Sequence, residues 1–144
     1  MITYYCPSCW STVAADTEVC PVCGASTQDR QADIVEKYIA ALRHPEPMTR
    51  LRAAWMLGRM RAERAVPALM QLVMARQAND PYVVSAAAKS LGLIGSRDAL
   101  PCLMELLRDA NASFMARAEA AEALERIGGA EAWATLADID THRH

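Results

Sequence analysis

The chain of 144 residues is poor in the features that build β-sheets or cross membranes. Phenylalanine occurs once, aromatic residues make up 6% of the sequence, and β-branched residues are scattered. Extended strands are therefore expected only in a short N-terminal segment. No apolar run reaches the roughly eighteen residues of a transmembrane helix. The first residues also lack the charged and apolar regions of a secretion signal, so we expect a cytoplasmic protein without a membrane partner.

A strong charge of either sign is absent too. The formal net charge is −2, but residues 1–29 hold three acidic side chains and no Lys or Arg, whereas residues 30–144 hold all 15 basic ones. Proteins that attract nucleic acid without regard to sequence carry basic groups that neutralise phosphates. This distribution disfavours a nucleic-acid partner.

The residue patterns of common active sites are missing as well. His44 lies in a proline-rich loop, and His142 and His144 lie at the C-terminal end. None of them is placed beside an acid and a hydroxyl or thiol nucleophile. Neither the Glu-x-x-His nor the His-Glu pairs of di-iron sites occur, and no glycine-rich phosphate loop is present. We therefore predict no catalytic residues and no enzymatic activity.

What the sequence does contain is a pair of Cys-Pro-x-Cys segments near the N-terminus. Each can place two thiolates on one side of a tight loop, and two facing loops form a tetrahedral site with four sulfur ligands. About twenty-five residues cannot bury enough apolar surface to fold alone, so a metal ion is expected to hold them together. Two disulfides are the weaker alternative. The predicted ligands are Cys6, Cys9, Cys20 and Cys23.

The stretch from Tyr5 to Gly24 resembles the short zinc ribbons found at the ends of many bacterial and archaeal proteins. Its second Cys-Pro-x-Cys segment also resembles the iron sites of rubredoxin-like proteins. We favour zinc as the cofactor over iron, because the chain offers no second redox centre. Trp10 follows the first segment where such ribbons usually have glycine. We expect a cost for a left-handed backbone there, offset by packing of Trp10 on the following domain.

From about Asp33 onward the sequence is alanine-rich and repetitive. Leu57, Leu91 and Leu124 recur at intervals of 34 and 33 residues, and each is followed twelve positions later by another leucine. A period of this size indicates stacked helix pairs. In the first helix of each pair, one face is predicted to be core, with these residues: Ala53, Ala54, Leu57 and Met60; Ala87, Ala88, Leu91 and Ile94; Ala120, Ala121, Leu124 and Ile127. The methionines are likewise interpreted as mostly core, and Cys102 as a small buried or half-buried thiol.

These segments resemble the short HEAT repeats of prokaryotes, including those of phycobilin lyase subunits. The matching features are Arg50 and Arg117 before the alanine pairs, Leu-Gly-x-Ile-Gly at 91–95, and Ala-x-Pro-x-Leu at 65–69 and 99–103. The resemblance implies an all-α fold, a short α-solenoid of about three and a half helix pairs behind a small zinc ribbon. The predicted domains are a ribbon at 1–28 and a repeat domain at 31–140. Within the latter we expect a capping helix at 31–43 and repeats at about 47–78, 80–110 and 113–140.

One predicted surface stands out from the repeats. Arg52, Trp55 and Arg59 are spaced to share one face of the first helix, away from its core positions, and the equivalents of Trp55 are Lys89 and Glu122. An outward Trp between two arginines has the composition of a protein-binding hot spot. Two alternatives are that Trp10, Asp16 and Glu18 of the ribbon dock on this face, or that it is simply solvated.

Three functions remain open from the sequence. The favoured one is a non-enzymatic scaffold that binds another protein, with Arg52, Trp55 and Arg59 as the hypothetical binding site. The second is a nucleic-acid or ribosome-associated module that uses the same arginines. The third is a subunit of a lyase-type enzyme, suggested only by kinship of the fold.

Overall fold

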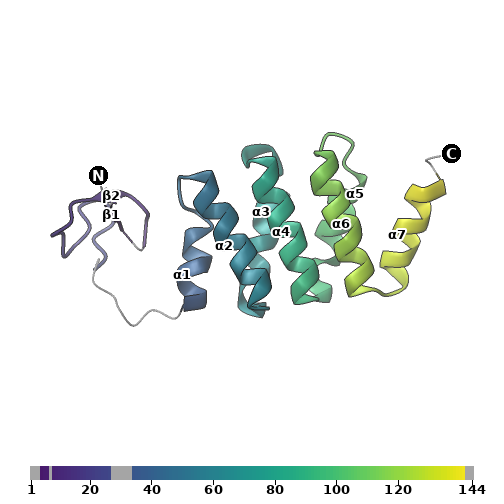
Figure 1. Cartoon of the computed structure of the whole chain (residues 1–144), viewed down its shortest axis with the longest axis horizontal. Helices are drawn as coiled ribbons and strands as arrows, with labels where there is room; N and C mark the ends of the chain where they lie inside the picture. The colour runs from purple at the N-terminus through teal and green to yellow at the C-terminus, as the bar shows by residue number, and fades with distance from the viewer. Residues whose placement is uncertain (1–3, 7, 27–33, 142–144) are drawn as a thin grey trace.

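The protein is a row of helix pairs with a small cysteine-rich ribbon at its N-terminal end (Figure 1). The computed structural model describes residues 4–6, 8–26 and 34–141. Along these residues the only paired strands are in the ribbon, where β1 (Tyr4–Tyr5) and β2 (Thr12–Val13) run antiparallel. Within the described part, no helix is both long and apolar enough to cross a bilayer. The predicted all-α solenoid is confirmed.

The described part of the chain forms seven α-helices, which lie side by side in Figure 1. They are α1 (Ile34–Ala41), α2 (Pro47–Arg59), α3 (Val66–Met74), α4 (Pro81–Ile94), α5 (Leu100–Arg108), α6 (Phe114–Ile127) and α7 (Ala130–Thr141). Short 3-10 turns at Glu63–Ala65, Arg76–Ala78 and Arg97–Ala99 connect some of them. The pairs α2–α3, α4–α5 and α6–α7 fall at the predicted repeats. The expected start of the capping helix at 31 lies outside the described residues, and the division into two domains stays a prediction.

Local sequence explains where the helices begin and end. The Asp80 carboxylate accepts a hydrogen bond from the Tyr82 amide at 2.8 Å, and Pro81 opens α4, so this start is a capped one. After α4 the chain turns at Gly95 with a φ of 78°. The equivalent residue after α2 is Arg61, which adopts a φ of 50° despite its side chain. Arg61 therefore carries a backbone cost that glycine avoids in the next repeat.

Leucine and alanine fill the core between the two helix layers. Leu57, Leu91 and Leu124 are fully buried on α2, α4 and α6, and Leu69 and Leu103 are fully buried on α3 and α5. This confirms the predicted leucine positions.

Methionine follows the prediction of a mostly core role only in part, because Met70 and Met104 pack partly buried against the core whereas four other methionines are exposed. None of the described methionines is fully buried, and Met60, a predicted core residue, is 38% exposed. The reason is that α2 ends at Arg59, so Met60 lies in the turn that leads into the left-handed Arg61.

The first helices of successive repeats approach each other so closely at Gly58 and Gly92 that these two positions have no room for a side chain. A methyl group added to Gly58 would lie 2.6 Å from Cβ of Ser90, and one added to Gly92 would lie 2.7 Å from Cα of Ala123. The Ser90 hydroxyl also donates to the carbonyl of Ala54 across the α2–α4 contact at 2.5 Å. Glycine is therefore required at both contacts.

The second helices are connected by one ion-pair group. Arg76, just after α3, donates from Nε to Oδ2 of Asp109 at 2.6 Å and from a terminal nitrogen to Glu105 at 3.4 Å. Arg76 and Asp109 are both largely buried, at 14% and 16% side-chain exposure. The hydrogen bond from Arg76 lowers the pKa of Asp109 below its ordinary value.

We predict that Gly92→Ala lowers the free energy of unfolding by about 1–3 kcal/mol, because the new methyl group meets the backbone of α6. The matched control is Glu125→Ala, at the equivalent position of α6, where the side chain is exposed. It should change stability by no more than about 0.5 kcal/mol. Urea unfolding monitored by circular dichroism measures both. Equal effects of the two substitutions would contradict the glycine requirement.

Asp109→Asn is expected to lower the melting temperature at neutral pH and to have less effect in acid. Because the folded-state pKa of Asp109 is depressed, its ionised form stabilises the fold above the unfolded-chain pKa of about 3.9. That contribution disappears as the pH falls through the lower folded-state pKa. The melting temperatures of the wild type and the variant, measured between pH 7 and pH 2, should therefore converge at the acid end. A difference that stays constant with pH would show that ionised Asp109 is not the source of the stabilisation.

Candidate metal centre and interaction surface

The two Cys-Pro-x-Cys segments fold into equivalent turns. In the first, the Cys6 amide donates to the Ser11 carbonyl and the Trp10 amide donates to the Cys6 carbonyl, both at 2.9 Å. The second repeats both bonds at 2.9 Å, from Cys20 to Ala25 and from Gly24 to Cys20. In both turns a backbone amide also donates to the first cysteine sulfur at 3.4 Å, from Ser8 to Cys6 and from Val22 to Cys20.

Trp10 occupies the position in the first turn that Gly24 fills in the second. Both have a left-handed backbone, with a φ of 62° at Trp10 and 76° at Gly24. This confirms the expected strain at Trp10, since a side chain in this region costs roughly 1 kcal/mol.

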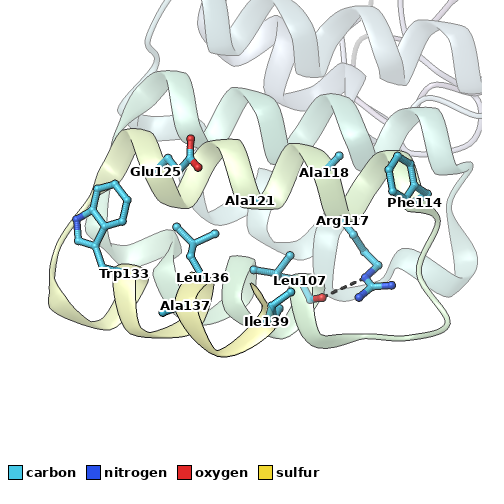
Figure 2. Close-up of a pocket in the computed structure, with 10 residues that line it drawn as sticks. All are labelled: Leu107, Phe114, Arg117, Ala118, Ala121, Glu125, Trp133, Leu136, Ala137 and Ile139. Carbon is cyan, nitrogen blue, oxygen red and sulfur yellow. Dashed lines mark hydrogen bonds between the residues drawn. The ribbon is translucent and has the colours of Figure 1, made fainter. Parts of the chain in front are cut away.

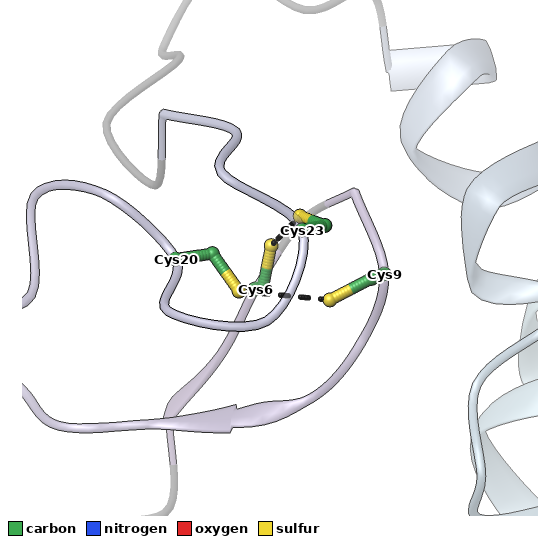
Figure 3. A group of neighbouring side chains, drawn as sticks. All are labelled: Cys6, Cys9, Cys20 and Cys23. Carbon is green, nitrogen blue, oxygen red and sulfur yellow. Dashed lines mark hydrogen bonds between the residues drawn. The ribbon is translucent and has the colours of Figure 1, made fainter.

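The four sulfur atoms converge on one point between the turns (Figure 3). All lie within 4.8 Å of one another, and the Cys6–Cys23 and Cys9–Cys20 sulfur pairs are each 3.6 Å apart. A disulfide would require about 2.05 Å, and all four cysteines are free. A tetrahedral ion with metal–sulfur distances of about 2.3 Å places its ligands about 3.8 Å apart. The cluster therefore fits a metal ion and not a pair of disulfides.

Hydrogen bonds and burial set different proton affinities around the cluster. The hydrogen bond between Cys9 Sγ and Ser11 Oγ, at 3.2 Å, lowers the pKa of Cys9 to about 6. At Cys23 a hydrogen bond with the Ala25 backbone acts to lower the pKa of the thiol. Burial and the three neighbouring sulfurs outweigh this hydrogen bond and raise the pKa of Cys23 to about 11. Without a cation, four thiolates so close together would repel one another. Metal binding must therefore displace protons from the cluster.

The ribbon contacts the solenoid at the end of α1 and in the turn that follows. The Trp10 indole donates from Nε1 to the carbonyl of Ala40. The ring of His44 lies edge-on to both Tyr5 and Trp10, with centroid distances of 4.5 and 4.9 Å. His44 is only 3% exposed, and its Nδ1 accepts from the Glu46 amide at 3.0 Å. The expected packing of Trp10 on the following domain is confirmed.

The place of this contact differs from one sequence-based alternative. That alternative has Trp10, Asp16 and Glu18 docking on the face of Trp55. It is wrong for Trp10, which contacts Ala40 and His44 instead, and Asp16 and Glu18 are exposed. The sequence places His44 only in a proline-rich loop, because a lone histidine carries no sign of the two aromatic rings that contact it.

The outer face of α2 carries an exposed aromatic side chain beside two arginines. Trp55 is 43% exposed, and the guanidinium carbon of Arg59 lies 4.6 Å from the centre of its ring, a cation–π geometry. Arg52 is exposed on the same helix, and Met48, one turn further, is 55% exposed. We name these four residues the Trp55 patch.

Sequence reasoning missed Met48, although the repeat contains a sign of it. Met48, Tyr82 and Met115 are spaced by 34 and 33 residues, the same register as Leu57, Leu91 and Leu124. All three are exposed, at 55%, 61% and 38%. The register therefore places one exposed apolar side chain near the start of each first helix.

The prediction of a buried thiol at Cys102 is confirmed, whereas the two C-terminal histidines are not described by the structure. Cys102 is 4% exposed, as predicted for a buried thiol, and burial raises its pKa to about 11. His142 and His144 lie outside the described residues.

We predict that the whole chain binds one metal ion and that Cys9→Ala abolishes tight binding, because three ligands leave the site open. The matched control, Cys102→Ala, removes a cysteine far from the cluster and should keep full stoichiometry. Metal content after gel filtration is the measurement.

Chelation should change the Trp10 environment while the helical circular-dichroism signal persists. A collapse of that signal would show that the ribbon is needed for the solenoid.

Comparisons with known proteins agree with the architecture. The chain matches the HEAT repeats over residues 35–125 and 72–143. A search of curated proteins found no match. Because the family match spans most of the chain and the helix pairs stack as such repeats do, the protein belongs to the HEAT repeat family.

Proposed function

We propose that the protein is a non-enzymatic scaffold that binds another protein through the Trp55 patch. HEAT repeats typically serve as interaction scaffolds, which supports the general role. The observation that carries the specific proposal is the exposed Trp55 ring under the Arg59 guanidinium.

The chemistry of the Trp55 patch favours an acidic partner with an apolar centre. Trp and Arg are enriched in binding hot spots, because they combine a large contact area with directional charge. Arg52 and Arg59 supply positive charge on either side of Trp55, and Met48 adds adaptable apolar surface. The arginine above Trp55 is already positioned by the ring, so less side-chain entropy is lost when a carboxylate binds it.

The aromatic centre of the patch and the arginine at position 52 occur in the first repeat alone. At the position of Trp55, α4 has Lys89 and α6 has Glu122, both exposed. At the position of Arg52, α6 has Glu119. Although α6 keeps an arginine, Arg126, at the position of Arg59, two glutamates replace Arg52 and Trp55 there, and this difference supports recognition at the α2 end of the row.

We further propose that the ribbon holds zinc and that the ion is structural. The four cysteines would fill a tetrahedral shell and leave no open position for substrate or water. Metal-binding thiolates persist where cysteines are kept reduced, which supports a cytoplasmic location.

The test is affinity capture from a lysate of the source cells with an Arg52→Ala, Trp55→Ala, Arg59→Ala variant. We expect the captured protein to be lost in the variant and retained after nuclease treatment. The matched control replaces Glu119, Glu122 and Arg126, the equivalent residues of α6, with alanine and should capture normally. Trp55 is exposed enough that its substitution should leave the melting temperature nearly unchanged.

Two outcomes would contradict the proposal. Capture that survives in the variant would exclude the Trp55 patch as the binding surface. Capture that disappears with nuclease would indicate nucleic acid instead, and binding should then weaken steeply with salt.

A further inference from the structure

A second surface, at the opposite end of the row, is separate from the Trp55 patch. Along α2 and α4, one stripe of residues faces the next first helix. The stripe is Pro47, Leu51, Ala54 and Gly58 on α2 and Pro81, Ser85, Ala88 and Gly92 on α4, and its equivalent on α6 is Phe114, Ala118, Ala121 and Glu125. The same spacing places each set of four on one helix face.

After its first residue, which is exposed on all three helices, this stripe is largely covered on α2 and α4 and less covered on α6. Ala54 and Ala88 are fully buried, Ser85 is 6% exposed, and both glycines contact the following helix. On α6, by contrast, Phe114 is 78% exposed, and Ala118 and Glu125 are also exposed. Along the described chain, therefore, no further first helix covers α6.

The uncovered stripe forms one wall of a groove between α6 and α7 (Figure 2). Its volume is about 470 Å³. Leu136 and Ile139 of α7 form the opposite wall, and Trp133, 55% exposed, lies at one end of the groove beside Glu125. Phe114 and Arg117 lie at the other end, where Arg117 donates from Nε to the Leu107 carbonyl at 3.1 Å.

We propose that this groove, which we name the end groove, is the interface of a twofold homodimer. A second copy of the chain would place its own α6 antiparallel against the first, with the two end grooves facing each other. Such isologous twofold contacts are by far the most common arrangement in homo-oligomers.

The two ends of the groove are complementary, which argues for a second copy as the occupant. Each end carries one large exposed aromatic and one charge, Phe114 with Arg117 at one end and Trp133 with Glu125 at the other. A twofold axis across the middle brings the positive end of one copy to the negative end of the other, twice. It also pairs Phe114 with Trp133 of the second copy, an aromatic contact that buries a large apolar area.

The centre of the groove favours close approach of the two helices. Ala118 and Ala121 flank the position of the axis, and their small side chains let the two α6 backbones come near each other. Glu125 stands where α2 and α4 have the glycine of the internal contact, so a second copy cannot stack as α4 and α6 do. The ribbon lies at the other end of the row and does not obstruct this face (Figure 1).

The test is the mass of the metal-loaded full chain in sedimentation equilibrium. We expect the wild type to approach twice the chain mass of 15.7 kDa as concentration rises. Ala118→Lys should remain a monomer, because the twofold axis brings two like charges together. Ala118→Glu should remain a monomer for the same reason, and an equimolar mixture of the two variants should restore the dimer.

The control is Ala134→Lys, at an exposed alanine of α7 outside the groove, which should dimerise like the wild type. All variants should keep the wild-type circular-dichroism spectrum, since residues 118 and 134 are exposed. A wild type that stays monomeric at every concentration would overturn the proposal. So would a dimer that survives Ala118→Lys, or a mass that grows beyond two chains.

Discussion

The close contact between successive first helices is the constraint on which the rest of this structure depends. Gly58 against Ser90 and Gly92 against Ala123 set the spacing of α2, α4 and α6. This spacing brings Leu57, Leu91 and Leu124 into one continuous core with the leucines of the second helices. It also lets Arg76 reach Asp109 across the second layer. A short solenoid has few contacts between distant residues, so each neighbour contact carries a large share of the stability.

The ribbon is coupled to this row through Trp10 and Tyr5, and Trp10 also links that contact to the cysteine cluster. Trp10 adopts a left-handed backbone that glycine would adopt without cost, and its indole donates to Ala40 and packs beside His44. The same turn holds Cys6 and Cys9. An ion that orders the turn therefore also positions Trp10 for contact with the solenoid. By linkage, the contact in turn favours the ordered turn and hence the metal-bound form.

Periodic features could be predicted from the sequence, whereas features without a period could not. The buried leucines, the ends of α4 at Asp80 and Gly95 and the cysteine cluster all follow from spacing and residue type. The burial of His44 depends on Tyr5 and Trp10, which are distant in sequence and follow no repeat. Helical spacing wrongly predicts Met60 as a core residue, because the spacing continues in the sequence although α2 ends at Arg59. Only part of the Trp55 patch could be predicted from the sequence. Trp55 stands out because the other repeats have a charged residue at its position, whereas Met48 has an apolar equivalent in every repeat.

Glu125 has a consequence for how a protein of this kind changes in length during evolution. Repeat proteins commonly grow by duplication of a unit, and a copy of the first or second repeat arrives with the glycine that the next unit needs. A copy inserted after α7 would instead meet Glu125, where the internal contacts leave no room for even a methyl group. Lengthening at that end requires a second change at residue 125, whereas duplication inside the row requires none. The addition of units is therefore easier in the interior than at the α6–α7 end.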